Sequence, residues 1–143
     1  MKITIGSDHR GYDLKEQIKQ AFSDVEWIDV GTDNGNDRFD YPIVAKKVCA
    51  NVLTGQSDRG ILLCGSGVGV SIAANRYPKI YAALCWSPEV ATAAREHDNA
   101  NILVLPADYL SVGEGIAIVK SWLNAQFLGG RYQMRLEMLE IAE

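Results

Sequence analysis

Cysteine is scarce in this sequence and basic runs are missing, and both shortages limit what the protein can be. The 143 residues include three cysteines, Cys49, Cys64 and Cys85, an odd number without C-x-x-C spacing. This pattern argues against a disulfide framework or a zinc site, so we expect no metal and a reducing, cytoplasmic setting. Because the formal net charge is −4, nonspecific nucleic-acid binding has little electrostatic support, and we expect no nucleic-acid partner.

Long hydrophobic runs are also missing. No apolar stretch reaches the ~18 residues that a membrane helix needs, so we expect no membrane partner. The opening segment MKITIGSD enters a strand pattern without the apolar core of a signal peptide. Hydrophobic residues make up 48% of the chain and charged residues 22%, as in ordinary globular proteins. A chain of this length can bury a hydrophobic core without the help of disulfides or metal ions, so we predict a single domain over residues 1–143.

Short apolar runs alternate with helical patterns. The predicted strands are residues 2–6, 25–31, 60–65, 81–86 and 101–106, of which the last three are nearly continuous in apolar residues, as in strands buried on both faces. Helical stripes are Leu14, Ile18 and Phe22; Val44, Val48 and Val52; Ile116, Val119 and Leu123; and Met134, Met138 and Ile141. Another helix begins at Pro88, with Ser87 as its N-cap. The order predicts an α/β fold: a doubly wound, Rossmann-like, five-stranded parallel sheet in a three-layer α/β/α sandwich, with an extra C-terminal helix.

In folds of this class, ligands bind beyond the carboxyl ends of the strands. Polar residues and glycines follow three of the predicted strands: Ser7, Asp8 and His9; Gly31, Thr32 and Asp33; and Cys64 to Gly69. The sequence therefore predicts a site at this edge of the sheet.

A glycine-rich stretch leads from the third strand into a helix. Its members are Gly65, Ser66, Gly67, Val68 and Gly69. The spacing is not G-x-G-x-x-G, no ribose-binding acid follows at the usual distance, and no Gly-Lys-Ser/Thr follows, so neither a dinucleotide fingerprint nor a P-loop is present. The stretch is either a tight turn or a cradle of backbone amides for an anion or oxyanion, and three glycines exceed what a turn requires.

Cys64 stands immediately before this stretch. A helix N-terminus favours the thiolate form of a cysteine, so a reactive thiol is one interpretation. Free cysteine is also among the most buried residue types, so a core residue is the other. Cys49 and Cys85 fit the core interpretation, and without a neighbouring resolving cysteine a redox role is less favoured.

Asp8 and His9 end the first predicted strand. Together with Ser7 and Arg10 they make an acid–base and anion-binding set. The alternative is that Asp8 caps the helix that begins near Tyr12.

His97 is predicted in a loop between the helix from Pro88 and the strand at Ile102. That loop lies at the amino edge of the sheet, and a five-residue strand spans roughly 17 Å. We therefore do not expect His97 to reach Cys64 of its own chain. It is either structural or part of a site completed by a second chain.

Arg131 and Arg135 are four residues apart on the final predicted helix. Like charges at this spacing repel, and neither arginine has an acidic residue three or four positions away. An external anion, or acidic groups elsewhere in the fold, must therefore balance the two positive charges. Two guanidinium groups suit a phosphate.

Taken together, these stretches resemble one family, the type B ribose-5-phosphate isomerases, a group that includes galactose-6-phosphate isomerase subunits. The matching stretches, in family order, are GSDHRGYDLK, DVGT, DYP, GILLCGSGVGVSIAANR, REHDNAN and GGRYQMR. The resemblance implies an aldose–ketose isomerase without a cofactor that interconverts ribose 5-phosphate and ribulose 5-phosphate through an enediolate, in the pentose phosphate pathway. It also implies a homodimer whose active sites are shared between subunits. A hexose 6-phosphate substrate and a noncatalytic sugar-phosphate-binding module are the alternatives.

The resemblance also implies roles by position. Cys64 matches the base that moves a proton between C1 and C2, and the amides of residues 65–69 match the groups that hold the enediolate. Ser66 matches a hydroxyl that positions the sugar, and His97 matches the residue that opens the furanose ring from the partner chain. Positions that contact sugar or phosphate are matched by Asp8, His9, Arg131 and Arg135.

Two positions depart from the family pattern. Asp98 stands where a sugar-contacting asparagine is usual, and Asp108 stands where an arginine that binds phosphate is frequent. The second departure removes a cation and adds an acid. Phosphate binding should weaken unless a lysine or arginine from elsewhere substitutes.

Overall fold

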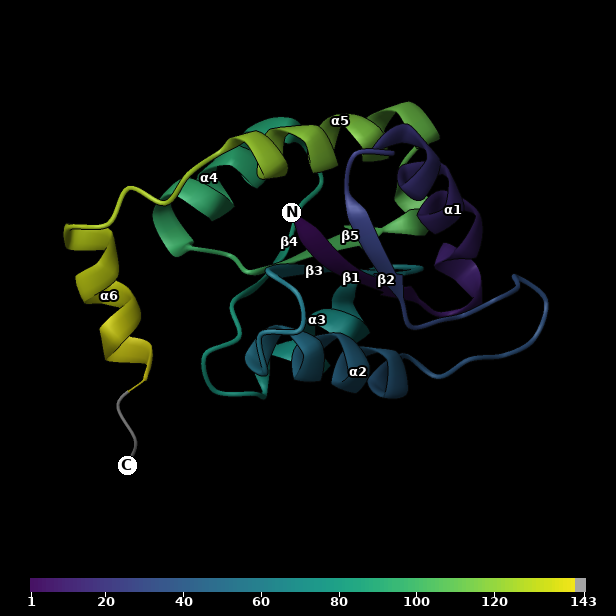
Figure 1. The fold of residues 1–143 in the computed structure, drawn as a ribbon, viewed down its shortest axis with the longest axis horizontal. Helices are drawn as coiled ribbons and strands as arrows, with labels where there is room; N and C mark the ends of the chain where they lie inside the picture. Colours follow the sequence, from purple (N-terminus) through teal and green to yellow (C-terminus); the bar gives the residue numbers. More distant parts are fainter. Residues whose placement is uncertain (141–143) are drawn as a thin grey trace.

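A five-stranded parallel sheet forms the centre of the computed structural model, which describes residues 1–140 (Figure 1). The strand order is β2-β1-β3-β5-β4. The strands are β1 (Lys2–Ser7), β2 (Glu26–Asp29), β3 (Arg59–Cys64), β4 (Ala82–Leu84) and β5 (Ile102–Pro106). Their order along the chain confirms the predicted α/β class.

Helices cover both faces of this sheet, which confirms the doubly wound, three-layer prediction (Figure 1). One face carries α1 (Tyr12–Ala21), α4 (Pro88–Asp98) and α5 (Val112–Asn124), and the other carries α2 (Tyr41–Leu53) and α3 (Val68–Asn75). Short 3-10 turns, η1 (His9–Gly11) and η2 (Ala107–Tyr109), follow β1 and β5. The extra helix α6 (Arg131–Leu139) stands to one side and contacts α4. Ile141, predicted on its apolar stripe, lies outside the described residues.

Two hydrophobic cores lie on the two faces of the sheet. Along β3, Ile61 and Leu63 pack in the core beneath α1, α4 and α5, whereas Leu62 and Cys64 pack in the core beside α2 and α3. This alternation explains why β3 is apolar at successive positions. The sequence also predicted that β4 is buried on both faces, and this is wrong. Its residues are only half-buried because β4 is an edge strand.

The start of α4 is confirmed and its end is a correction. Ser87 Oγ accepts a hydrogen bond from the Val90 N–H, and Pro88 occupies the first turn. At the other end, His97 lies in the last helical turn and not in a loop, because the helix continues to Asp98 and closes at Asn99 in the left-handed conformation.

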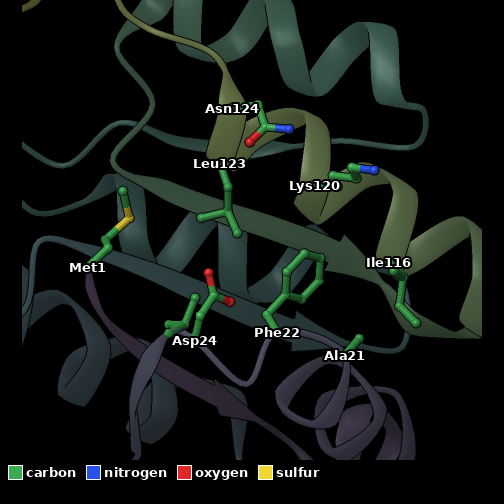
Figure 2. Close-up of a pocket in the computed structure, with 9 residues that line it drawn as sticks. Met1, Ala21, Phe22, Asp24, Ile116, Lys120, Leu123 and Asn124 are labelled. Carbon is green, nitrogen blue, oxygen red and sulfur yellow. The ribbon is translucent and has the colours of Figure 1, made fainter.

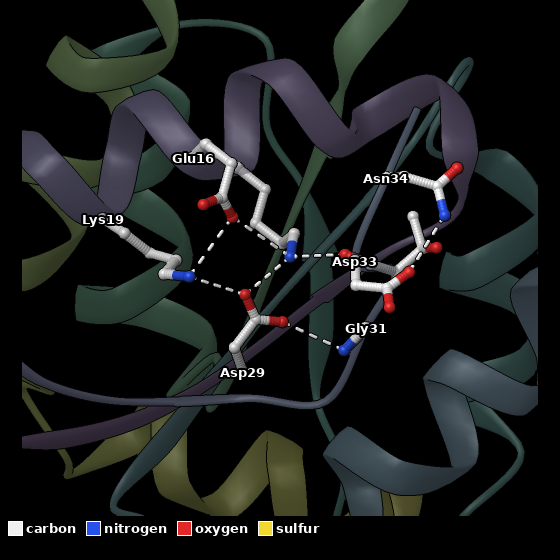
Figure 3. A network of polar contacts seen from close by, with 8 residues as sticks. Glu16, Lys19, Asp29, Gly31, Asp33 and Asn34 are labelled. Carbon is white, nitrogen blue, oxygen red and sulfur yellow. Dashed lines mark hydrogen bonds and ion pairs between the residues drawn. The ribbon is translucent and has the colours of Figure 1, made fainter. Parts of the chain in front are cut away.

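A buried lysine ties α1 to β2 and to the loop that follows β2 (Figure 3). The Lys15 side chain is only 1% exposed, and its Nζ donates to Asp29 Oδ2 at 2.6 Å and to the Thr32 carbonyl at 2.7 Å. Lys19 donates to the same Asp29 oxygen at 2.7 Å. The loop is fixed in turn against the end of β1, because the Thr32 N–H donates to the Ser7 carbonyl.

The ionisation of Asp29 reflects this network. Burial raises the pKa of its carboxyl, but hydrogen bonds from Lys15, Lys19 and the Gly31 N–H outweigh burial, and the pKa lies below its ordinary value. The carboxylate therefore stabilises the fold above pH 3.8, the ordinary value. This contribution is lost as the pH falls through the lower, folded-state pKa.

We expect Asp29→Asn to lower the free energy of unfolding by about 1–3 kcal/mol at pH 7, because it removes the nearer of the two carboxylates that pair with buried Lys15 and leaves only Glu16, at 3.3 Å. Urea denaturation of the wild type and the variant measures the difference, which should shrink below pH 3.8. Exposed Asp24→Asn is the matched control and should have little effect. A loss at Asp29 that is independent of pH would contradict this assignment.

Candidate active site

Cys64 lies in a pocket of about 310 Å³ at the carboxyl edge of the sheet. The pocket is built from the turns that follow β1, β3 and β5, together with the start of α2. Its lining consists of Asp8, Arg10, Tyr41, Cys64, Gly65, Ser66, Gly69, Asp108 and Tyr109. The chain leaves β1 and β3 toward opposite sides of the sheet, and ligands of open α/β sheets bind at such a switch point. The predicted edge therefore does bring Cys64, Asp8 and the glycine-rich turn together.

The sulfur of Cys64 is held by the backbone of the turn that follows it. The Gly67 N–H donates to Cys64 Sγ at 3.2 Å, and α3 begins at the next residue. Gly67 has a φ of 77°, a left-handed conformation that glycine adopts without strain. The sulfur therefore lies at the N-terminus of α3, next to the backbone N–H of the residue that precedes this helix.

The other two cysteines have a different environment. Burial raises the pKa of Cys49 and that of Cys85 to about 12. Both side chains are fully buried in the hydrophobic cores. They are thiols at neutral pH, which confirms that they are core residues.

The rest of the glycine-rich turn lines the pocket and begins α3. Ser66 Oγ accepts a hydrogen bond from the Val68 N–H at 3.2 Å. Gly69 lies under the ring of Tyr41, where a Cβ atom would come within 2.9 Å of the ring. The turn therefore starts a helix and also forms one wall of the pocket.

Asp8 and His9 both support the end of β1. Asp8 Oδ1 accepts from the N–H groups of Arg10 and Gly11, so the carboxylate caps η1, the turn that leads into α1. Asp8 also lines the pocket, and the capping and pocket interpretations hold together. His9 Nδ1 accepts from the Phe39 N–H at 3.4 Å, so a neutral His9 carries its proton on Nε2.

A second group of predicted residues gathers around Tyr132. The His97 ring stacks on Tyr132 with centroids 4.6 Å apart. The guanidinium groups of Arg131 and Arg135 lie 5.0 and 5.7 Å from the centre of the same ring. Arg131 also donates to Tyr132 Oη at 3.0 Å. Asp98, exposed at the end of α4, is next to His97 in this group.

The structure does not bring this second group to Cys64 of the same chain. His97 precedes the amino end of β5, whereas Cys64 lies beside Pro106 at its carboxyl end. The strand between them spans roughly 17 Å. Helix α6 stands beside the sheet, away from α1 (Figure 1). Each group therefore contains only part of the predicted site.

Some of these contacts had no sequence prediction. Tyr41 and Tyr109 line the pocket, and Tyr132 organises the second group. The sequence offered one signal for the role of Tyr132: it lies between two arginines whose positive charges repel each other. Tyr109 had none, because its place depends on η2 lying beside the turn after β3.

A larger cavity of about 500 Å³ lies between α1 and α5, near the amino end of β1 (Figure 2). Its lining is mainly apolar, with Phe22 and Leu123 pointing inward and Asp24 and Lys120 beside them. This lining offers no thiol, imidazole or glycine-rich turn. The chemistry expected from the sequence belongs to the pocket at Cys64.

Residues 1–140 offer neither a metal-binding cluster nor a membrane-spanning helix. No three His, Cys, Asp or Glu side chains in this part of the chain lie close enough together to hold a metal ion. None of its helices is both long and apolar enough to cross a membrane.

Sequence comparison identifies relatives over almost the whole chain. The family described as Ribose/Galactose Isomerase matches residues 3–139. Ribose-5-phosphate isomerase B of Escherichia coli strain K12 is 41% identical over 144 residues, covering 99% of this chain and 96% of that protein. A putative sugar phosphate isomerase of Bacillus subtilis, YwlF, is 41% identical over 138 residues, covering 95% and 93%.

Solved structures agree with these relatives. A ribose 5-phosphate isomerase from Thermotoga maritima superposes with a TM-score of 0.95 at 45% identity, covering 97% of both chains. Ribose-5-phosphate isomerase B from Mycoplasma genitalium, solved with bound ribulose-5-phosphate, has a TM-score of 0.92 at 39% identity and covers 97% of this chain and 93% of that one.

The environments of the three cysteines predict selective alkylation. We expect iodoacetamide at neutral pH to modify Cys64 at least about tenfold faster than Cys49 or Cys85, because the thiolate is the nucleophile. Mass spectrometry of tryptic peptides measures the three rates, with the unfolded protein as the control in which all three react. Equal rates in the folded protein would contradict the contrast drawn between these thiols.

Proposed function

This chain belongs to the Ribose/Galactose Isomerase family, and on that premise we propose that it is a type B ribose-5-phosphate isomerase, which interconverts ribose 5-phosphate and ribulose 5-phosphate. The observation that carries the proposal is the pocket in which a backbone amide and a helix N-terminus hold Cys64 Sγ. Relatives that bear this activity in their names, and a neighbour with bound ribulose-5-phosphate, support the choice of a pentose phosphate.

We propose Cys64 as the base of the proton transfer. Its thiolate takes the proton from C2 of the open-chain aldose, while the C1 carbonyl oxygen becomes part of an enediolate. The O2 hydroxyl proton passes to O1, the thiol returns its proton to C1, and the C2 oxygen becomes the carbonyl of the ketose. Protons and electrons balance within one sugar molecule, so we propose that the reaction uses no cofactor.

Stabilisation of the enediolate is assigned to the glycine-rich turn. A hydrogen next to a carbonyl becomes acidic only when the developing oxyanion is stabilised, and backbone amides at a helix N-terminus supply that stabilisation. In this proposal Gly65, Gly67, Val68 and Gly69 form the wall that faces the oxyanion. Ser66 and Asp8 position the sugar hydroxyls, since both line the pocket.

The second group is assigned to the site of a neighbouring subunit in a homodimer. His97 opens the furanose ring, Asp98 contacts the sugar, and Arg131 and Arg135 bind the phosphate together with His9. The separation of this group from Cys64 supports the assignment, because one chain alone cannot complete the site. Apolar side chains exposed near both groups support a contact between copies: Val68, Ile72, Trp86, Met134 and Met138.

The setting of the enzyme follows from the same chemistry. We propose that it acts in the cytoplasm, since all three cysteines are free. The net charge of −4 supports the absence of a nucleic-acid partner. The expected partners are a small sugar phosphate and a second copy of this chain.

Replacing the base should abolish turnover. We expect Cys64→Ala to lower kcat by about 10²–10⁴-fold with the fold intact, because a positioned general base contributes that much. Proton NMR with ribose 5-phosphate in D₂O follows ribulose 5-phosphate formation and deuterium entry at C1 of that product. Cys85→Ala is the matched control. Near wild-type turnover by Cys64→Ala would show that Cys64 is not the base.

Mixing two inactive variants should restore activity if the site is shared. When Cys64→Ala and His97→Ala subunits exchange freely, half of the dimers are hybrids with one intact site, so we expect roughly a quarter of the wild-type activity. Native mass spectrometry establishes the exchange. Hybrid dimers without activity would show that His97 does not complete the site of another copy.

A further inference from the structure

An ion pair between Arg10 and Asp108 lies at the pocket of Cys64. Arg10 belongs to η1, which follows β1, and Asp108 belongs to η2, which follows β5. These strands flank β3 on either side. The pair therefore spans the end of β3, where the glycine-rich turn begins.

The turn itself is shaped to receive this pair. A Cβ atom at residue 65 would lie 2.7 Å from Asp108 Oδ2 and 2.9 Å from Arg10 Nε, so any other residue there would displace the ends of both side chains. The Asp108 N–H donates to the Gly65 carbonyl at 2.9 Å, which fixes η2 against the turn. On the other side, Asp8 accepts from the Arg10 N–H. Backbone contacts thus hold both partners in place.

The charges of the pocket lining suggest a role for Arg10 in binding an anion. Among the pocket-lining residues in the described part of the chain, Arg10 is the only cation, whereas Asp8 and Asp108 are both carboxylates. A phosphate monoester that enters this pocket meets two negative charges and one positive charge. Without Arg10, no cationic side chain in this lining would offset the two carboxylates.

Depth decides which part of a sugar phosphate Arg10 faces. Cys64 is 6% exposed at the base of the pocket, whereas the Arg10 side chain is 59% exposed at its mouth. The reacting carbons of an aldose phosphate are at one end of the molecule and must reach Cys64. The phosphate is at the other end, so it points toward the mouth.

We propose that Arg10 binds the phosphate of the substrate and that Asp108 is a positioning residue that orients the Arg10 guanidinium. The inference rests on the proposed sugar-phosphate isomerase function. An ion pair to one edge of a guanidinium leaves its other N–H groups free to donate, and a planar fork suits phosphate oxygens. Arg10 then joins His9 as a phosphate ligand of this subunit, opposite Arg131 and Arg135 of the other subunit.

The first test compares the KM for ribose 5-phosphate with competitive inhibition by inorganic phosphate. We expect Arg10→Ala to raise both the KM and the inhibition constant by about 10–100-fold, as for a lost charged hydrogen bond, with a much smaller change in kcat. Arg10→Lys should recover part of the loss, since it restores a charge without the fork. Lys2→Ala, which breaks an exposed ion pair at the amino end of β1, is the matched control.

The role of Asp108 is tested by a double-mutant cycle. In the wild-type background, Asp108→Asn should raise the KM several-fold, because Arg10 loses its orientation. In the Arg10→Ala background the same change should lower the KM, because it removes a carboxylate that faces the phosphate unpaired. A purely structural ion pair would not reverse the sign, and thermal unfolding verifies that all variants fold.

The outcomes separate this inference from the proposed function. An unchanged KM in Arg10→Ala overturns it, and so does a raised KM with unchanged inhibition by phosphate, which would place Arg10 on the sugar hydroxyls. A wild type without turnover would instead overturn the proposed function. Calorimetric titration of wild type and Arg10→Ala with inorganic phosphate would then still decide whether Arg10 binds a phosphate.

Discussion

The parallel register of β1, β3 and β5 is the constraint on which the pocket depends. Ser7 lies opposite Leu63 and Cys64 lies opposite Pro106, so the three strands end at one level and their turns meet. Two backbone hydrogen bonds extend this register into the turns, from the Asp8 N–H to the Leu63 carbonyl and from the Asp108 N–H to the Gly65 carbonyl. A slip of β3 by one residue would turn Cys64 to the opposite face.

Local signals made much of this structure predictable. Apolar runs identified every strand, Ser87 and Pro88 marked a helix start, and the site fell at the expected edge because parallel strands share one. The burial of β4 was mispredicted, since apolar composition does not show which strand is at the edge. The loop assigned to His97 was wrong because its polar neighbours, Asp98 and Asn99, continue and close a helix. The pairing of Arg10 with Asp108 depends on β5 lying beside β3, and no local pattern encodes that neighbour.

The two groups of site residues differ in how they are held. Cys64 and its turn are fixed by backbone hydrogen bonds at the end of a buried strand. His97 and the two arginines are organised by one aromatic ring, Tyr132, which joins α4 to α6 through stacking and cation–π contacts. In the proposed mechanism, the backbone-held group serves proton transfer, which requires close geometry. In the same proposal, the ring-held group recognises the sugar ring and its phosphate.

The tight fit of Arg10 and Asp108 over Gly65 also limits how this sequence can change. Loss of either charge leaves the other without its partner beside the turn, and a side chain at residue 65 would displace the ends of both. We therefore expect substitutions at these three positions to depend on one another. Among related sequences, a different residue at position 108 is expected to coincide with a different residue at position 10, while glycine persists between them.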